Sequence, residues 1–252
     1  MHGKELFLAK QKTSVFYPPD DISFEIYSSE IWKGFVSKLD NKNLNIIDVG
    51  CGGGTTLHVL QQLGYKKLSG IDYIDTIPKS FVKDFKFYHE DIFDSTLKDN
   101  DYDALVAAMV IEHVPEKAFV DELYRILKPN GLGLVTSVLK NKYAWYWYKN
   151  KHGKYAIHPD HIKEYTSVKE FENLFKRKFD TLLIRKTLLK YPIFDPVAKF
   201  LMNIRGFGFL RNAMTTNKFL KKLRLLRIII PNYYAVEILV RKNSKLSQKN
   251  ER

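Results

Sequence analysis

The chain of 252 residues carries a formal net charge of +13, and 45% of its residues are hydrophobic. This composition fits a folded chain with a substantial core and excludes an intrinsically disordered one. No apolar run approaches the roughly 18 residues of a membrane-spanning helix, and the first residues lack the apolar core of a secretory signal. The single cysteine excludes a disulfide framework and a thiolate-rich metal site, and a cytoplasmic location is the expectation.

The positive charge is concentrated in the last third of the chain. Residues 1–175 hold 22 basic and 24 acidic side chains, whereas residues 176–252 hold 19 basic and 4 acidic ones. A surplus of this kind suits nucleic acid, an anionic membrane surface or an acidic substrate. A solvated basic face with a frayed tail is the alternative.

The first forty residues are expected to form a preamble or lid, with a helix over residues 24–39 that packs over the sheet edge or the cleft. The main domain is expected over residues 41–242. It begins with the apolar strand pattern of residues 46–49, which leads into Asp48 and then Gly50, Gly52 and Gly54. A glycine-rich turn between a strand and a helix lets a nucleotide-like ligand approach the backbone closely. The dinucleotide fingerprint requires a different glycine spacing, so a nicotinamide cofactor is disfavoured.

Further strands are predicted over residues 68–72, 85–91, 103–108 and 133–137, with an amphipathic helix over residues 115–127. Repeated strand–helix units favour a doubly wound, Rossmann-like α/β fold, with the ligand at the carboxyl ends of the parallel strands. Two of these strands end in an acid, Asp72 and Asp91. Asp72 is expected to accept hydrogen bonds from two ribose hydroxyls. Asp91 and Ile92 suit an adenine ring, although Asp91 would serve equally as a helix cap.

The second half is less regular. Residues 138–165 are expected to form a long loop or lid, and residues 167–175 a helix with Ser167 as its N-cap. Strands over residues 180–189 and 233–241 could pair. Residues 190–231 between them would form a helical insertion that includes a basic amphipathic helix over residues 218–230, and residues 243–252 would form a disordered basic tail.

Three segments follow the glycine motif in a fixed order: residues 102–106, residues 110–114 (Val-Ile-Glu-His-Val) and residues 127–131 (Leu-Lys-Pro-Asn-Gly). With Asp-x-Gly-x-Gly-x-Gly, they resemble the motif series of class I S-adenosylmethionine-dependent methyltransferases, in particular the small-molecule and ubiquinone-type members. The resemblance covers about residues 44–140. It implies a seven-stranded, mostly parallel sheet whose last strand is antiparallel, and S-adenosyl-L-methionine as cofactor.

The resemblance also implies that Ala108 and Met109 line the methionine end of the cofactor. Asp48 would hold the turn and face the cofactor's ammonium group. The residues predicted to bind the cofactor are Asp48, Gly50, Cys51, Gly52, Gly54, Asp72, Tyr73, Asp91, Ile92, Ala108 and Met109. Some ubiquinone-type members bind a divalent metal through an extra acid before the Glu-His pair; Met109 stands near that position, and no metal is predicted.

Methyl transfer to an oxygen of high pKa needs a general base, and a neutral imidazole is suitable near pH 7. His158 and His161 are the candidates, because a similar segment borders the cleft in related enzymes; packing of the lid is the alternative for His161. His113 is expected to be structural. An aromatic cluster, residues 143–148, could line an apolar or sugar-like acceptor or anchor the insertion.

The leading hypothesis is therefore a methyltransferase acting on an oxygen of a small molecule, a lipid-linked intermediate or a saccharide. The basic residues 218–230 could contact an anionic membrane, so that the protein would be peripheral to it; they could also bind RNA phosphates or pack as a lid with a solvated face. An RNA methyltransferase and a non-catalytic cofactor-binding module remain the alternatives.

Overall fold

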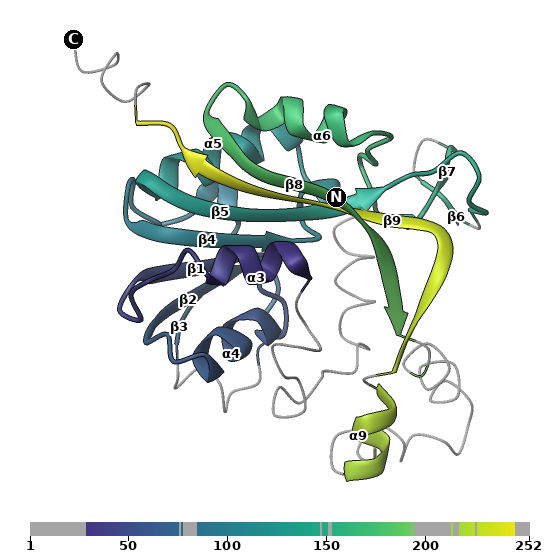
Figure 1. Cartoon of the computed structure of the whole chain (residues 1–252), viewed down its shortest axis with the longest axis horizontal. Coiled ribbons are helices and arrows are strands. Elements are labelled where there is room, and N and C mark those ends of the chain that lie inside the picture. The colour runs from purple at the N-terminus through teal and green to yellow at the C-terminus, as the bar shows by residue number, and fades with distance from the viewer. Residues whose placement is uncertain are drawn as a thin grey trace.

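The computed structural model describes residues 29–75, 77, 85–146, 148–150, 153–192, 194, 213, 217–224 and 226–244. Their main feature is a seven-stranded sheet with the strand order β3-β2-β1-β4-β5-β9-β8 (Figure 1). Its strands are β1 (Asn45–Val49), β2 (Lys67–Asp72), β3 (Lys86–His89), β4 (Tyr102–Ala108), β5 (Leu127–Leu139), β8 (Phe179–Pro192) and β9 (Arg227–Lys242). The predicted fold class is confirmed.

The first five strands are parallel, and the order reverses between β1 and β4. The glycine turn and the acidic strand ends therefore lie at the same edge of the sheet, where such folds bind their ligands. The last strand, β9, is antiparallel to β5 on one side and to β8 on the other. The pairing predicted between the two C-terminal strands is thus confirmed, with longer strands than the sequence indicated.

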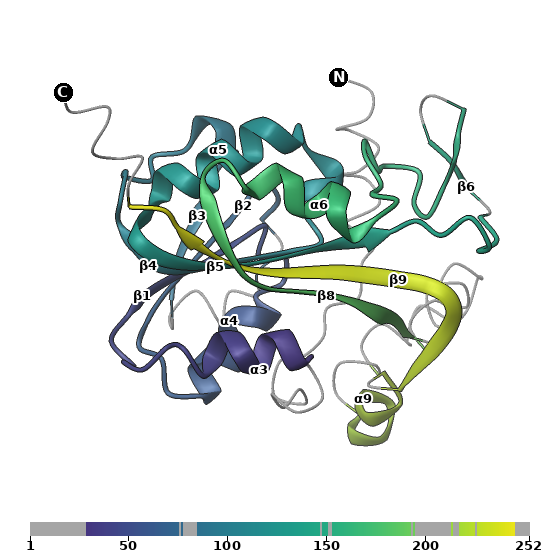
Figure 2. The same cartoon turned by 45° about the horizontal axis from the view of Figure 1, so that its top comes forward.

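Helices cover both faces of the sheet (Figure 2). The helices α3 (Glu30–Val36) and α4 (Thr55–Gln62) lie on one face, and α5 (Glu116–Ile126) and α6 (Val168–Phe175) on the other. Each face has its own apolar cluster: one gathers Trp32, Phe35 and Leu57, the other Phe119, Phe171 and Phe175. Because both faces are covered, the central strands β1 and β4 are mostly apolar.

Local sequence explains where these helices begin. The Ser167 hydroxyl accepts the Glu170 amide at 3.1 Å, so this predicted N-cap is confirmed. The Ser29 side chain caps α3 in the same way, and its hydroxyl also donates to Glu237 on β9 at 2.9 Å. The described part of the preamble therefore packs into the core against the sheet. Residues 1–28, which include the start of the predicted helix, lie outside the described residues.

Three predicted segments differ from the structure. The loop expected over residues 138–165 begins with the end of β5 and contains a short hairpin of β6 (Tyr148–Lys149) and β7 (Tyr155–Ala156). The insertion expected over residues 190–231 is shorter, because β8 continues to Pro192 and β9 begins at Arg227. The helix predicted over residues 218–230 is wrong beyond Arg224: α9 (Lys218–Arg224) ends there, and the run of three isoleucines after it favours a strand.

The outer parts of β8 and β9 extend beyond the other strands and carry α9 near their tip (Figure 1). We call residues 217–224 and 226–230 the arm. At the other end of β9, the last described residues are Asn243 and Ser244. The amide of Asn243 donates to the backbone carbonyl of Lys178 at 3.1 Å. The rest of the predicted tail lies outside the described residues. Among the helices that the structure describes, none is long and apolar enough to span a bilayer.

Candidate cofactor and methyl-transfer site

The turn after β1 has the backbone conformation that its glycines suggest. Gly50, Gly52 and Gly54 have φ values of +74°, +49° and +80°, in the left-handed region. A Cβ on Gly50 would lie 2.3 Å from Cγ2 of Val110, so the turn packs tightly against the segment after β4. A Cβ on Gly52 would meet nothing within 4 Å. The turn is thus closed on the Gly50 side and open above Gly52, where a ligand can approach the backbone.

Asp72, at the end of β2, is fastened to this turn. Its carboxylate accepts the amide of Gly52 at 2.8 Å and that of Ile74 at 2.8 Å, one on each oxygen. Burial raises its pKa, and these two amides and His89 act in the opposite direction. Each carboxylate oxygen keeps a second lone pair, so both can still accept a ribose hydroxyl.

Asp48 lies beneath the turn and is almost completely buried. Burial raises its pKa to about 7, a hydrogen bond from Thr56 lowers it, and the nearby charge of Asp72 raises it further. A buried carboxyl with this pKa attracts a cation strongly when it is ionised. This arrangement suits the ammonium group of an amino-acid ligand.

The remaining predicted cofactor residues surround the same sheet edge. Asp72 on β2 pairs with His89, the last residue of β3, and Asp91 lies two residues beyond it. Its carboxylate accepts the Phe93 amide at 3.2 Å and caps the short helix η2 (Ile92–Asp94). The helix cap was one of the two roles that the sequence suggested for Asp91. Tyr73 is partly exposed, whereas Ile92 and Cys51 are buried.

Ala108 and Met109 end β4 beside the turn. Met109 adopts φ +58°, which is uncommon outside glycine, and its amide donates to Thr136 on β5 at 3.1 Å. The next residue, Val110, is the one that touches Gly50. The side chain of Val110 therefore packs the glycine turn against the segment that leads into the short helix η3 (Ile111–His113).

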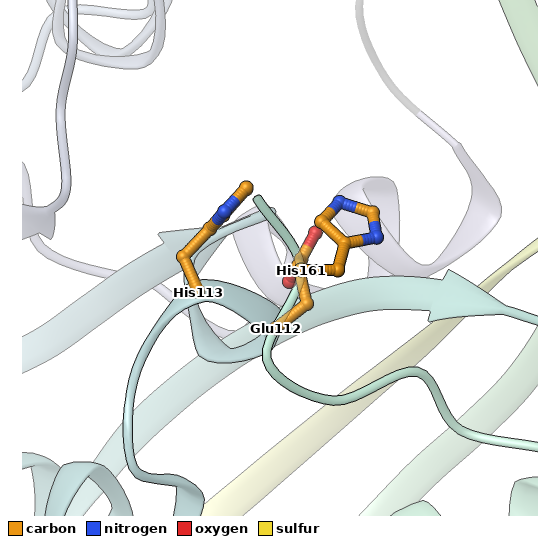
Figure 3. A group of neighbouring side chains, drawn as sticks. All are labelled: Glu112, His113 and His161. Carbon is orange, nitrogen blue, oxygen red and sulfur yellow. The ribbon is translucent and has the colours of Figure 1, made fainter. Parts of the chain in front are cut away.

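Polar side chains of η3 and of the segment after β7 form a cluster. Glu112, His113 and His161 lie close together (Figure 3). The rings of His113 and His161 are 4.8 Å apart, and those of His158 and His161 are 5.4 Å apart. Backbone bonds hold the two segments together, because the amide of Ile162 donates to the Glu112 carbonyl at 2.8 Å. The two predicted candidate bases thus lie beside the Glu-His pair.

Burial governs the charges in this cluster. It raises the pKa of Glu112 to about 7, while the backbone, His161 and the Ser137 hydroxyl at 2.9 Å act to lower it. Burial also lowers the pKa of His113 to about 4, and the neighbouring His161 adds to that effect. His113 is therefore neutral at pH 7. His158 is the more exposed of the candidate bases, and its Nδ1 lies 3.6 Å from Asp160.

Sequence reasoning missed Glu164. Its Oε1 lies 2.7 Å from Nδ1 of His161, and both side chains are buried. Its other oxygen lies 3.8 Å from the Lys140 ammonium group. The only sequence signal was an acid three residues after a histidine, which is common and carries little information by itself.

Glu112, His113 and His161 each offer one atom that could bind a metal ion, and these atoms lie within 4.8 Å of one another. The Ser137 hydroxyl donates to Glu112, and Glu164 contacts His161 at Nδ1 and not at Nε2. Met109 supplies no oxygen where an acid would be needed. The absence of a metal remains a prediction.

Two other regions lie apart from this cluster. A hollow lined by Asn45, Lys67, Lys86 and Lys128 is at the amino-terminal strand ends, the opposite edge from the glycine turn. Of the predicted aromatic cluster, Trp145 is largely exposed, and the Tyr146 hydroxyl donates to the Asn141 carbonyl at 2.7 Å. Trp147 lies outside the described residues.

Comparisons with known proteins agree with this geometry. Residues 47–135 match a family model described as a methyltransferase domain. The chain is 31% identical over 134 residues to the mitochondrial ubiquinone biosynthesis O-methyltransferase of Dictyostelium discoideum, covering 46% of this chain and 41% of that protein. The chain thus spans less than half the length of the curated relatives it matches.

Solved structures share the fold over most of the chain. A SAM-dependent methyltransferase from Methanosarcina mazei superposes with a TM-score of 0.54 at 14% identity, covering 83% of this chain and 97% of that one. The [4+2]-cyclase SpnF superposes with a TM-score of 0.56 at 16% identity, covering 83% and 79%. At such identities the likeness establishes the fold and not the reaction.

The sheet order, the left-handed glycine turn and the acid at the end of β2 define an α/β protein with a site for a nucleoside cofactor. Together with the match of residues 47–135 to the methyltransferase-domain model, they make this chain similar to the class I S-adenosylmethionine-dependent methyltransferases.

Proposed function

We propose that this protein transfers the methyl group of S-adenosyl-L-methionine to an oxygen atom of a small molecule. The observation that carries the proposal is the glycine turn fastened to Asp72, with buried Asp48 beneath it. This arrangement offers acceptors to a ribose and a carboxylate to an ammonium group, two of the polar parts of the cofactor. The curated relatives are O-methyltransferases by name, which supports oxygen as the acceptor.

The protein's contribution to catalysis is mostly positioning. The sulfonium is already an activated leaving group, so the acceptor must be held in line with the methyl carbon while water is excluded. An acceptor hydroxyl must also lose its proton. The polar cluster after β4 provides two candidates for that step: His161, which is buried, and His158, which is partly exposed.

We further propose that the acceptor is apolar or lipid-linked and that the arm contacts an anionic membrane surface. Phe219 on α9 and Ile229 on β9 are 67% and 53% exposed, and Lys218 and Lys222 are exposed on the same helix. Apolar side chains interspersed with lysines are suited to anionic lipid headgroups. The protein would then be cytoplasmic and peripheral to the membrane. A saccharide acceptor has no specific support among the described residues.

Methyl-label transfer tests the reaction and the acceptor together. Tritiated S-adenosylmethionine and the protein are incubated with separated lipid, small-metabolite and RNA extracts, and label stable to mild acid is counted in each. Label in the lipid or small-metabolite fraction supports the proposal. Label in RNA alone would establish an RNA methyltransferase instead, and no label with intact binding of S-adenosylhomocysteine would favour a non-catalytic binding module.

Binding to vesicles tests the arm separately. Sedimentation with phosphatidylglycerol vesicles should decrease with salt and in the double variant Phe219→Ala/Ile229→Ala, while neutral phosphatidylcholine vesicles should bind weakly. Equal binding of the variant would exclude the arm as the contact.

A further inference from the structure

His161 and Glu164 form a buried pair with a defined proton arrangement. Nδ1 of His161 lies 2.7 Å from Oε1 of Glu164, with side chains 6% and 7% exposed. An ionised carboxylate only accepts hydrogen bonds, so the proton of a neutral imidazole must lie on Nδ1, between the two groups. Nε2 of His161 is then left with a lone pair. This is the tautomer that a general base requires.

Glu164 is itself fixed from two directions. The same Oε1 accepts the amide of Ile157 at 2.6 Å, and Oε2 lies 3.8 Å from Nζ of Lys140, which directly follows β5. Lys140 also donates to the carbonyl of Tyr155 on β7. The carboxyl group therefore has the Lys140 ammonium group near one oxygen and the Ile157 amide donor at the other.

Three other titratable side chains lie near His161: Glu112, His113 and His158. His113, 4.8 Å away ring to ring, is neutral at pH 7 because burial lowers its pKa to about 4. His158 lies 5.4 Å away and has Asp160 beside it. The carboxyl of Glu112 is close enough that His161 acts on its pKa. A positive charge on His161 would thus lie beside the carboxyl groups of Glu112 and Glu164.

We infer that Glu164 is a positioning residue that holds His161 in the tautomer with a bare Nε2 and stabilises the imidazolium that forms during methyl transfer. The inference rests on the proposed function. As the acceptor oxygen bonds to the methyl carbon, the carbon–sulfur bond breaks and its electron pair stays on sulfur, giving S-adenosylhomocysteine. The hydroxyl proton moves to Nε2 of His161. The positive charge that leaves the sulfonium thereby reappears on the imidazolium, beside Glu164.

Nitrogen spectra of the protein labelled with ¹⁵N-histidine test the tautomer without any acceptor. The chain has seven histidines, and His161→Ala identifies the resonance by its disappearance. The expected spectrum at about pH 8 has a protonated, hydrogen-bonded Nδ1 and an unprotonated Nε2 for His161. A proton on Nε2 in the wild-type protein would overturn the inference.

Three substitutions separate charge from geometry. The oxygen of Glu164→Gln can still accept from Ile157 and from Nδ1, so the tautomer should persist while the negative charge is lost. Label transfer into the lipid and small-metabolite extracts should then fall about tenfold, and the acidic limb of its pH profile should move about one unit lower. Glu164→Ala should lose the tautomer and at least 100-fold of the rate. Glu164→Asp should recover part of both.

Glu170→Gln is the matched control. Glu170 binds Thr166 and Lys163 in the same segment but makes no contact with His161, so its loss should leave the pH limb unchanged. If Glu164→Gln keeps both the full rate and the acidic limb of the pH profile, Glu164 is only a structural anchor and the inference is overturned. Loss of wild-type turnover on chelation, with recovery on added Mg²⁺ or Zn²⁺, would make the cluster a metal site and also overturn the inference. Failure to bind S-adenosylhomocysteine would instead refute the proposed function.

Discussion

The carboxylate of Asp72 accepts the amide proton of Gly52 at 2.8 Å, so the end of β2 is tied to the turn after β1. This bond places an acid beside the open side of the glycine turn. The same carboxylate therefore orders the turn and recognises the ribose of the proposed cofactor.

Asp72→Ala is expected to weaken binding of S-adenosylhomocysteine at least about 100-fold, because two hydrogen bonds to a charged acceptor are lost at roughly 1.5–3 kcal/mol each. Isothermal calorimetry measures the effect. Asp75→Ala, three residues away and exposed, is the control and should bind normally. Unaltered affinity in Asp72→Ala would remove the ribose assignment.

Gly50→Ala is expected to destabilise the turn and abolish binding of the same ligand. The new Cβ would lie 2.3 Å from Val110 in addition to the strain of a φ of +74°. Gly64→Ala isolates the strain, because Gly64 has φ +89° and open space around its Cβ. Thermal unfolding should show a larger loss for Gly50→Ala than for Gly64→Ala, and Val110→Ala should partly rescue the former. Equal losses would contradict the packing argument.

Binding of S-adenosylhomocysteine is expected to weaken about tenfold between about pH 8 and pH 6, because Asp48, with a pKa of about 7, becomes protonated and no longer attracts the ammonium group. Asp48→Asn should bind weakly at both pH values. Calorimetry in matched buffers gives both affinities.

The stability of the ligand-free protein should change in the opposite direction over the same range. The folded pKa of Asp48 lies above its ordinary value, so its contribution is fully present below about pH 4 and is lost as the pH rises through 7. Glu112, raised to about 7 as well, acts in the same sense. Asp48→Asn should therefore raise the melting temperature at about pH 8 and alter it little at pH 5; a lower melting temperature at pH 8 would refute the assignment.

Lys242→Met is expected to lower the free energy of unfolding by about 3 kcal/mol. The Lys242 ammonium group is buried and donates to Asn100, Tyr124 and Leu127, each at 2.7 Å, and methionine would leave these acceptors unsatisfied. Urea unfolding measures the loss, and Arg241→Met, at the exposed neighbouring position, should be nearly neutral. Binding of S-adenosylhomocysteine should survive in both.

The glycine turn, the strand-end acids and the sheet were predictable because each depends on local signals. Glycines with positive φ, an acid at a strand end and apolar runs all follow from short stretches of sequence. The same holds for the Ser167 cap. The glycine turn and the strand-end acids also lie within residues 44–140, which the family resemblance covers.

The rest depends on long-range packing. The basic segment after Lys218 has helical periodicity, yet its isoleucines join β9 because β8 offers a partner strand. Lys242 was expected at the border of a solvated tail, but carbonyls from α5 and β5 enclose it. The role of Glu164 could not be predicted, because only the fold brings Lys140 and His161 next to its carboxylate.

The last of the described strands in the chain, β9, lies inside the sheet between β5 and β8. During synthesis, β5 and β8 would therefore emerge from the ribosome with their inner edges bare, and would stay so until residues 227–242 arrived. Unpaired strand edges invite association between nascent chains. Completion of this sheet is thus postponed until residues 227–242 have been synthesised, and shortened products ending before residue 227 should need chaperones to remain dispersed.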